Sequence, residues 1–179
     1  MSDVSAGQQT IPPFSGDERL VLEGMVEWYR HELVRKIDGI SEAQARAHLV
    51  PSATTLGGLL KHMRWVELNW FERVLAGRSD DELPAPPWSD DNPDGDMTLT
   101  DDETLASVID DYWRQIAISR GIAAGLPLDF NGTHEQIGDV SLRWVYVHMI
   151  DEIARHTGHA DILRELTDGF VGDEPEGLT

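Results

Sequence analysis

The chain has 179 residues, of which 40% are hydrophobic and 26% are charged, a composition typical of a globular protein with one core. Its formal net charge of -19 argues against binding to nucleic acid or to anionic membranes, because both depend on clustered lysine and arginine. The absence of cysteine excludes disulfides, thiolate metal ligands and a cysteine nucleophile.

The N-terminal part predicts a polar leader and one long helix. Residues 1–14 lack the basic start and hydrophobic stretch of a signal peptide, and no apolar run approaches the roughly 20 residues of a membrane span. We therefore expect a flexible leader and a cytoplasmic protein. Helical spacing of apolar residues predicts a helix over 17–37. Ser41, with Gln44 three residues later, has the pattern of a capping box, which predicts a short helix that ends before Pro51.

A second long helix and a long loop follow. The helix is expected over 55–76, with Gly77 as its end signal. The segment 78–102 is rich in proline, aspartate and glycine, which predicts a long acidic loop. Loops of this length are usually functional or disordered, and Trp88 and Met97 as apolar anchors favour a partly ordered lid over a site.

Two further helices complete the chain. The third is expected to begin at Thr100 or Asp101 and to end near Gly125, and a polar loop leads to the fourth, over 140–166. No strand pattern and no internal repeat is visible. The sequence therefore predicts an all-α four-helix bundle.

The last of these helices carries the most informative pattern. At 100° per residue, His148, Glu152, His156 and His159 fall within an arc of roughly 80°, so they share one face. Neutral imidazole and carboxylate suit zinc, nickel, iron or manganese, and an i, i+4 pair such as Glu152 and His156 can bind one ion. A third donor must come from elsewhere. The best placed is His62, which lies at the edge of the apolar stripe of the second long helix and would point into the bundle.

The same residues have a plainer interpretation, which the residues alone leave open. A histidine-rich helix can be a polar seam whose imidazoles are satisfied by carboxylates such as Glu67, Asp151 or Asp161. A dinuclear centre of the ferritin kind would need Glu-x-x-His pairs on facing helices, and the sequence lacks them. Most aromatic side chains are expected in the core or a dimer interface, with one or two lining a pocket: Trp28, Trp65, Trp70, Trp113, Trp144 and Tyr146.

Four stretches of the chain carry a family resemblance: PPFSGDERLVLEGMVEWYR, KIDGISEAQAR, PSATTLGGLLKHMRWVELNWF and HMIDEIARHTGHADILRE. Over nearly its whole length the chain resembles DinB-like (DinB/YfiT) proteins, in a subfamily of unassigned function typical of actinobacteria. The resemblance implies an up-down-down-up left-handed four-helix bundle with one long crossover, and often a homodimer. We accordingly expect a leader over 1–14, the bundle domain over 15–168 and an acidic tail over 169–179.

The resemblance also implies a metal site. In that superfamily a metal is held by one histidine of the second helix and by an i, i+4 pair on the last helix. His62, Glu152 and His156 match these three positions, with Glu152 where many relatives carry histidine. His159 falls in the short motif that follows the pair, so His159, with His148 as the second choice, is expected to relay protons as a catalytic residue.

Enzymes of the superfamily use a low-molecular-weight thiol such as mycothiol or bacillithiol, and a metal can lower the pKa of that thiol toward neutrality. The resemblance therefore implies a metal- and thiol-dependent S-transferase or isomerase, with zinc as the first choice of metal and a small molecule as substrate. Two alternatives stay open. One is a non-catalytic dimeric bundle that binds a metal or a small ligand, and the other is a purely structural dimerising bundle.

Overall fold

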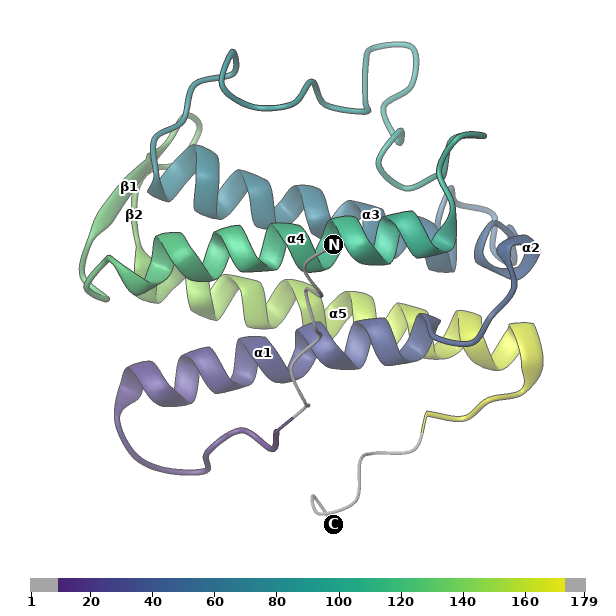
Figure 1. Ribbon diagram of the computed structural model, residues 1–179, viewed down its shortest axis with the longest axis horizontal. Helices are drawn as coiled ribbons and strands as arrows, with labels where there is room; N and C mark the ends of the chain where they lie inside the picture. Colours follow the sequence, from purple (N-terminus) through teal and green to yellow (C-terminus); the bar gives the residue numbers. More distant parts are fainter. Residues whose placement is uncertain (1–9, 173–179) are drawn as a thin grey trace.

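The computed structural model describes residues 10–172, which form a mainly helical protein with one small hairpin (Figure 1). Residues 1–9 of the expected leader and 173–179 of the expected tail lie outside the described residues. The long elements are α1 (Glu18–Ile37), α3 (Leu56–Glu67), the π-helix η1 (Leu68–Leu75) that continues α3, α4 (Leu105–Ala124) and α5 (Leu142–Asp168). The short ones are α2 (Glu42–Ala45), β1 (Asn131–His134) and β2 (Gly138–Ser141). The prediction of a mainly helical protein is confirmed.

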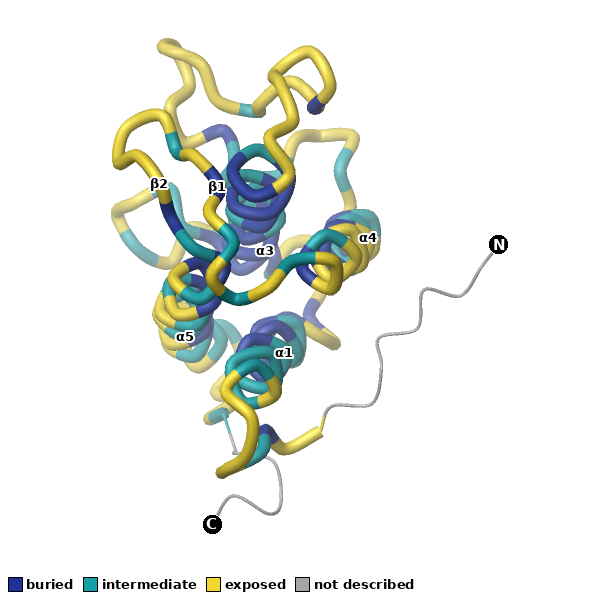
Figure 2. Tube along the Cα trace, turned by 90° about the vertical axis from the view of Figure 1, so that its left-hand side faces the viewer, coloured by how far each residue is buried: buried dark blue, intermediate teal, exposed yellow. Residues whose placement is uncertain are grey.

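The long helices surround one apolar core. In Figure 1, α1 and α5 run in one direction and α3 and α4 run in the opposite direction. Seen end-on in Figure 2, they follow one another around the core in the order α3, α4, α1, α5. The closest packing joins α1 to α5 and α3 to α4. Burial of the inner faces drives this arrangement. Among the described residues, no helix is long and apolar enough to cross a membrane.

Side-chain caps determine where the helices begin. A carboxylate or hydroxyl accepts a backbone N–H at the start of each long helix, from Asp17, Thr55, Thr104 and Ser141. The predicted capping box of the short helix is confirmed, because Ser41 and Gln44 each bond the other's backbone N–H.

One predicted boundary and one predicted helix type are wrong for local reasons. The third long helix begins at Leu105 and not at Thr100 or Asp101, because Thr104 and Ser107 form a capping box there. The expected continuous helix over 55–76 changes to a π-helix after Glu67. π-helical turns are rare and occur often near functional sites.

The expected polar loop before the last helix contains strands, so the prediction of no strands is also wrong. β1 and β2 pair antiparallel from Asn131 with Ser141 to His134 with Gly138, whose φ of 79° suits the turn. The hairpin lies tightly against η1, since a Cβ at Gly132 would come within 2.3 Å of the carbonyl oxygen of Val74. The sequence 138–141 is therefore a strand, and α5 starts after it.

A buried ion-pair network links three of the helices. Arg30 of α1 donates to both carboxylate oxygens of Glu67 of α3, with 2.7 Å for each bond, and the two side chains are 3% and 0% exposed. Arg30 also donates to Glu27 at 2.6 Å, and Glu27 accepts two bonds from Arg120 of α4. Burial alone would lower the pKa of Arg30, but the charges of Glu67 and Glu27 raise it.

Removing the charge of Glu67 should destabilise the fold strongly, because Arg30 would stay buried without its main partner. We expect Glu67→Gln to lower the free energy of unfolding by ~3 kcal/mol, measured by urea titration. The control is Asp111→Asn, which breaks an exposed pair with Arg114 and should cost less than about 1 kcal/mol. Equal losses in the two variants would contradict a structural role for the buried pair.

Glu27 should make stability depend on pH in the acid range. Burial alone would raise the pKa of Glu27, but the hydrogen bond from Arg120 and the charge of Arg30 lower it from 4.5 to about 2. The stabilisation is therefore present above pH 4.5 and is lost as the pH falls toward 2. We expect Glu27→Gln to have a flatter stability profile than wild type over this window, measured by thermal unfolding. A profile as steep as that of wild type would contradict this role of Glu27.

Candidate functional site

The three expected metal ligands come together from two helices that are distant in the sequence. His62 lies on α3, and Glu152 and His156 lie one turn apart on α5. The ring centroids of His62 and His156 are 4.8 Å apart and meet edge to face. Glu152 Oε2 lies 3.4 Å from His156 Nε2. The structure therefore forms a half-buried cluster of two imidazoles and one carboxylate between α3 and α5.

His156 is the most enclosed of these side chains. Its Nδ1 atom is buried and has no hydrogen-bond partner among the described residues. Burial and the nearby His62 lower the pKa of His156 from 6.5 to about 4, so its ring is neutral at pH 7. A buried nitrogen without a partner is costly, and neutral imidazole is the form that binds a metal ion. The chemistry of this side chain fits a metal ligand.

His62 has a carboxylate partner that the sequence did not indicate. Its Nδ1 lies 2.7 Å from Oδ2 of Asp96, which comes from the acidic loop between η1 and α4. Asp96 is one of several aspartates in that loop, and no spacing distinguishes it from the others. The sequence feature that could have indicated docking of a loop near His62 is the Gly57-Gly58 pair of α3, since glycines on a helix permit close approach of another backbone.

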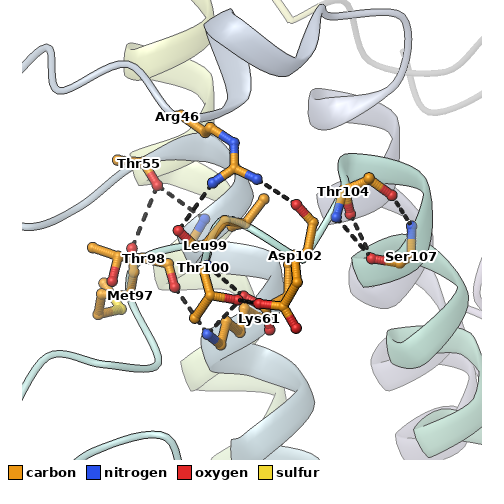
Figure 3. A network of polar contacts seen from close by, with 12 residues as sticks. Arg46, Thr55, Lys61, Met97, Thr98, Leu99, Thr100, Asp102, Thr104 and Ser107 are labelled. Carbon is orange, nitrogen blue, oxygen red and sulfur yellow. Dashed lines mark hydrogen bonds and ion pairs between the residues drawn. The ribbon is translucent and has the colours of Figure 1, made fainter.

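The end of the acidic loop, which begins directly after Asp96 in the sequence, is fixed against α3 (Figure 3). Lys61 donates to the carbonyl oxygen of Thr98 at 2.9 Å, and Arg46 donates to that of Leu99 at 2.9 Å. The loop backbone also packs directly on Gly58, where no side chain could fit, because a Cβ there would lie 1.7 Å from the carbonyl oxygen of Met97. These contacts set the position of Asp96 beside His62.

The other predicted anchor of the loop also makes a contact. The ring of Trp88 meets that of Trp65 on α3 edge to face, with centroids 5.4 Å apart. Trp88 is still 39% exposed, so it packs on α3 without entering the core. The loop thus touches α3 at both Trp65 and Gly58.

His148 lies in an aromatic cluster beside Glu152. Its ring stacks on Trp144 at 4.9 Å and meets the edge of Trp70 at 4.7 Å. On the far side of Trp70, His134 of the hairpin stacks at 5.2 Å. His148 Nε2 is 3.8 Å from Glu152 Oε1, too far for a hydrogen bond. Burial lowers the pKa of His148, and the charge of Glu152 opposes that shift.

His159 lies at the solvent side of the cluster. It is exposed, and its ring centroid is 5.5 Å from that of His156. The shared face expected for His148, Glu152, His156 and His159 therefore appears as a line of contacts along α5, from the aromatic cluster at one end to solvent at the other.

The side chains of this cluster are chemically suited to bind a metal ion, but their present arrangement is not that of a metal site. Within residues 10–172, no group of three or more histidine, aspartate or glutamate side chains is arranged to hold a metal ion as the side chains stand. The donors themselves, imidazole nitrogen and carboxylate oxygen, are those that zinc and related ions bind. The carboxylates named for a polar seam have cationic partners instead: Glu67 pairs with Arg30, Asp151 with Arg155 and Asp161 with Lys36.

The chain is thus a mainly helical protein with a half-buried histidine and carboxylate cluster between two helices. A family model of mycothiol-S-transferases matches residues 21–169. The chain belongs to the mycothiol-S-transferase family, which is DinB/YfiT-like, and the resemblance to DinB-like proteins is confirmed. No curated protein matches the chain.

A methyl group at Gly58 should release the end of the acidic loop. We expect Gly58→Ala to speed hydrogen exchange of the backbone amides over 96–103, because the Cβ would overlap the carbonyl oxygen of Met97. The control is Gly121→Ala on α4, where a Cβ meets nothing within 4 Å, and which should stabilise the protein by about 0.5–1 kcal/mol. Unchanged exchange over 96–103 in Gly58→Ala would refute the role of this contact.

Proposed function

We propose that this protein is a metal-dependent S-transferase or isomerase that uses a mycothiol-type thiol, with a divalent ion held by His62, Glu152 and His156. Zinc is the first choice, and nickel, iron or manganese are the alternatives. The observation that carries the proposal is the meeting of these three side chains between α3 and α5. The buried Nδ1 of His156, which has no partner in the described chain, adds to it.

The family and the composition support a thiol supplied from outside. The chain has no cysteine, so the sulfur nucleophile must be a cosubstrate, as the mycothiol-S-transferase family implies. A bound metal would lower the pKa of that thiol so that thiolate forms near neutral pH. A second small molecule, as yet unassigned, would accept the sulfur or be isomerised.

Asp96 would orient His62 in this site. His62 Nδ1 lies 2.7 Å from Asp96 Oδ2, so we assign the ring proton to Nδ1, which would leave the lone pair on Nε2 free to bind an ion. Carboxylates commonly orient histidine ligands in this way. Because Asp96 is fixed by contacts of the loop with α3, loop position and ligand orientation are coupled.

The catalytic roles of the two remaining histidines follow from their places. His159 lies between His156 and solvent, and we assign it the exchange of protons between the site and bulk water. His148 is the second candidate, since it lies beside Glu152 at the other end of the face. The Trp70 and Trp144 rings around His148 would limit access of water there.

We also propose the architecture that the family implies. The helix directions in Figure 1 support an up-down-down-up four-helix bundle over residues 15–168. The acidic loop between η1 and α4 would act as a lid over the site through its contacts at Trp65 and Gly58. A cytoplasmic homodimer that binds neither nucleic acid nor membrane completes the proposal, in keeping with the net charge of -19.

One observation favours a second candidate function. His62 is already bonded to Asp96, and no group of three donors among residues 10–172 is arranged to hold an ion as it stands. A non-catalytic protein that binds a metal or a small ligand would be consistent with this arrangement. It differs from the enzyme in showing no turnover of a thiol.

Metal analysis separates these functions. We expect about one metal ion per chain in protein purified without an affinity tag, and loss of that ion in His62→Ala and His156→Ala, measured by plasma mass spectrometry. The control is His48→Ala, which removes an exposed histidine of the connecting segment before α3 and should retain the metal. Absence of metal in the wild-type protein, even after reconstitution, would refute both metal-dependent functions.

Turnover is measured on the same samples with mycothiol and a bimane electrophile. The enzyme should form the bimane thioether faster than the uncatalysed reaction, should lose this activity on chelation and should recover it with zinc. A bound metal without any such acceleration across thiols and electrophiles would favour the non-catalytic function.

A further inference from the structure

A cavity whose lining includes none of the histidine-cluster residues lies on another side of the molecule. It has a volume of about 490 Å³ and is lined mainly by α1 and α4. In the end-on view of Figure 2, α1 and α4 are neighbours on one side of the bundle, and α3 and α5 are neighbours on the other. The cavity is therefore separate from His62, Glu152 and His156, and its size lies in the range of small-molecule sites.

Long polar side chains join the two helices around this cavity, and the ring of His31 on α1 also packs against that of Trp113 on α4. Glu27 of α1 accepts bonds of 2.8 and 2.5 Å from Arg120 of α4. At the start of α1, Arg19 donates to the carbonyl oxygens of Ala123 and Leu126 at 2.6 and 2.7 Å. These bridges hold α1 and α4 together while leaving space between them.

The charges that line the cavity are balanced. Arg30 and Arg120 both bind Glu27, and Glu23 binds Arg19 and the hydroxyl of Tyr146. A guanidinium has five N–H donors and a carboxylate has about four acceptor positions, so paired groups of this kind keep hydrogen-bonding capacity. Because neither sign of charge is in excess, the lining suits an uncharged ligand with many hydroxyl groups better than a phosphate or a cation.

One buried hydroxyl in the lining has no partner. Ser119 is 0% exposed, and its Oγ makes no hydrogen bond within the described part of the chain. A buried hydroxyl left unpaired costs free energy, which a ligand hydroxyl could recover. Val26, Phe71 and Ala123 add an apolar part to the lining, as is needed for the C–H face of a sugar ring.

We propose that this cavity binds an uncharged polyhydroxylated small molecule of about monosaccharide size, with Ser119 as one of its hydrogen-bond partners. The proposal concerns a second site and goes beyond the thiol chemistry proposed for the histidine cluster. Loss of metal or of thiol turnover would leave it unaffected.

The test is an NMR titration of the full chain with methyl α-D-glucopyranoside, with inorganic phosphate as the comparison ligand. We expect saturable shifts of backbone amides around 23–31 on α1 and 119–124 on α4 with the glucoside, and none there with phosphate. Ser119→Thr and Ser119→Val form a matched pair, because the two side chains have nearly the same shape and only threonine keeps the hydroxyl. The valine variant should bind roughly tenfold more weakly than the threonine variant.

Three outcomes would overturn the proposal. They are an absence of shifts at these amides, tighter binding of phosphate than of the glucoside, and equal affinity in the threonine and valine variants. The unfolding temperature of each variant checks that it folds. Should Ser119→Val fail to fold, Arg120→Met, which removes a partly exposed donor from the lining, should weaken glucoside binding in its place, and unchanged affinity would likewise overturn the proposal.

Discussion

The buried pair between Arg30 and Glu67 is the interaction on which both sides of this protein depend. It joins α1 to α3 through two charge-assisted bonds, and Glu27 extends it to Arg120 of α4. On one side, these polar links join α1 to α4 beside the cavity that the two helices line. On the other, they fix the rotation of α3. His62 precedes Glu67 by five positions, or roughly 140° around the helix, so a Glu67 that faces α1 leaves His62 turned away toward α5.

Helix α3 thus presents different chemistry on different faces. Its glycine pair accepts the returning acidic loop at van der Waals contact, and Lys61 binds the loop backbone. One residue further, His62 meets both Asp96 of that loop and His156 of α5. The loop is therefore part of the candidate site, because its docking on Gly58 brings the Asp96 carboxylate to His62.

The sequence predicted those features that depend only on residues close together along the chain. The capping box at Ser41 and the common face of the α5 histidines follow from the spacing of a few neighbours along one helix. Asp96 could not be found in this way, because its place depends on a contact between segments far apart in the sequence. The hairpin was missed because its short strands contain polar residues and glycine, and its position depends on packing of Gly132 against Val74.

The π-helix η1 supplies the aromatic ring of Trp70, which borders the histidine face of α5 at the His148 end. A π-helical turn holds more residues than an α-helical one, so it changes the direction of every side chain that follows. In η1, Trp70 contacts Trp144 and His148 of α5, while the adjacent Phe71 packs near Tyr146. The histidine face of α5 is consequently bordered by aromatic rings at the His148 end, where the His148 side chain is still 23% exposed, and it ends at the exposed His159. In the proposed reaction, a thiol and its reaction partner would meet beside this histidine face. A transfer between two small molecules needs such a shared surface, because both must be held in one place and in the right orientation.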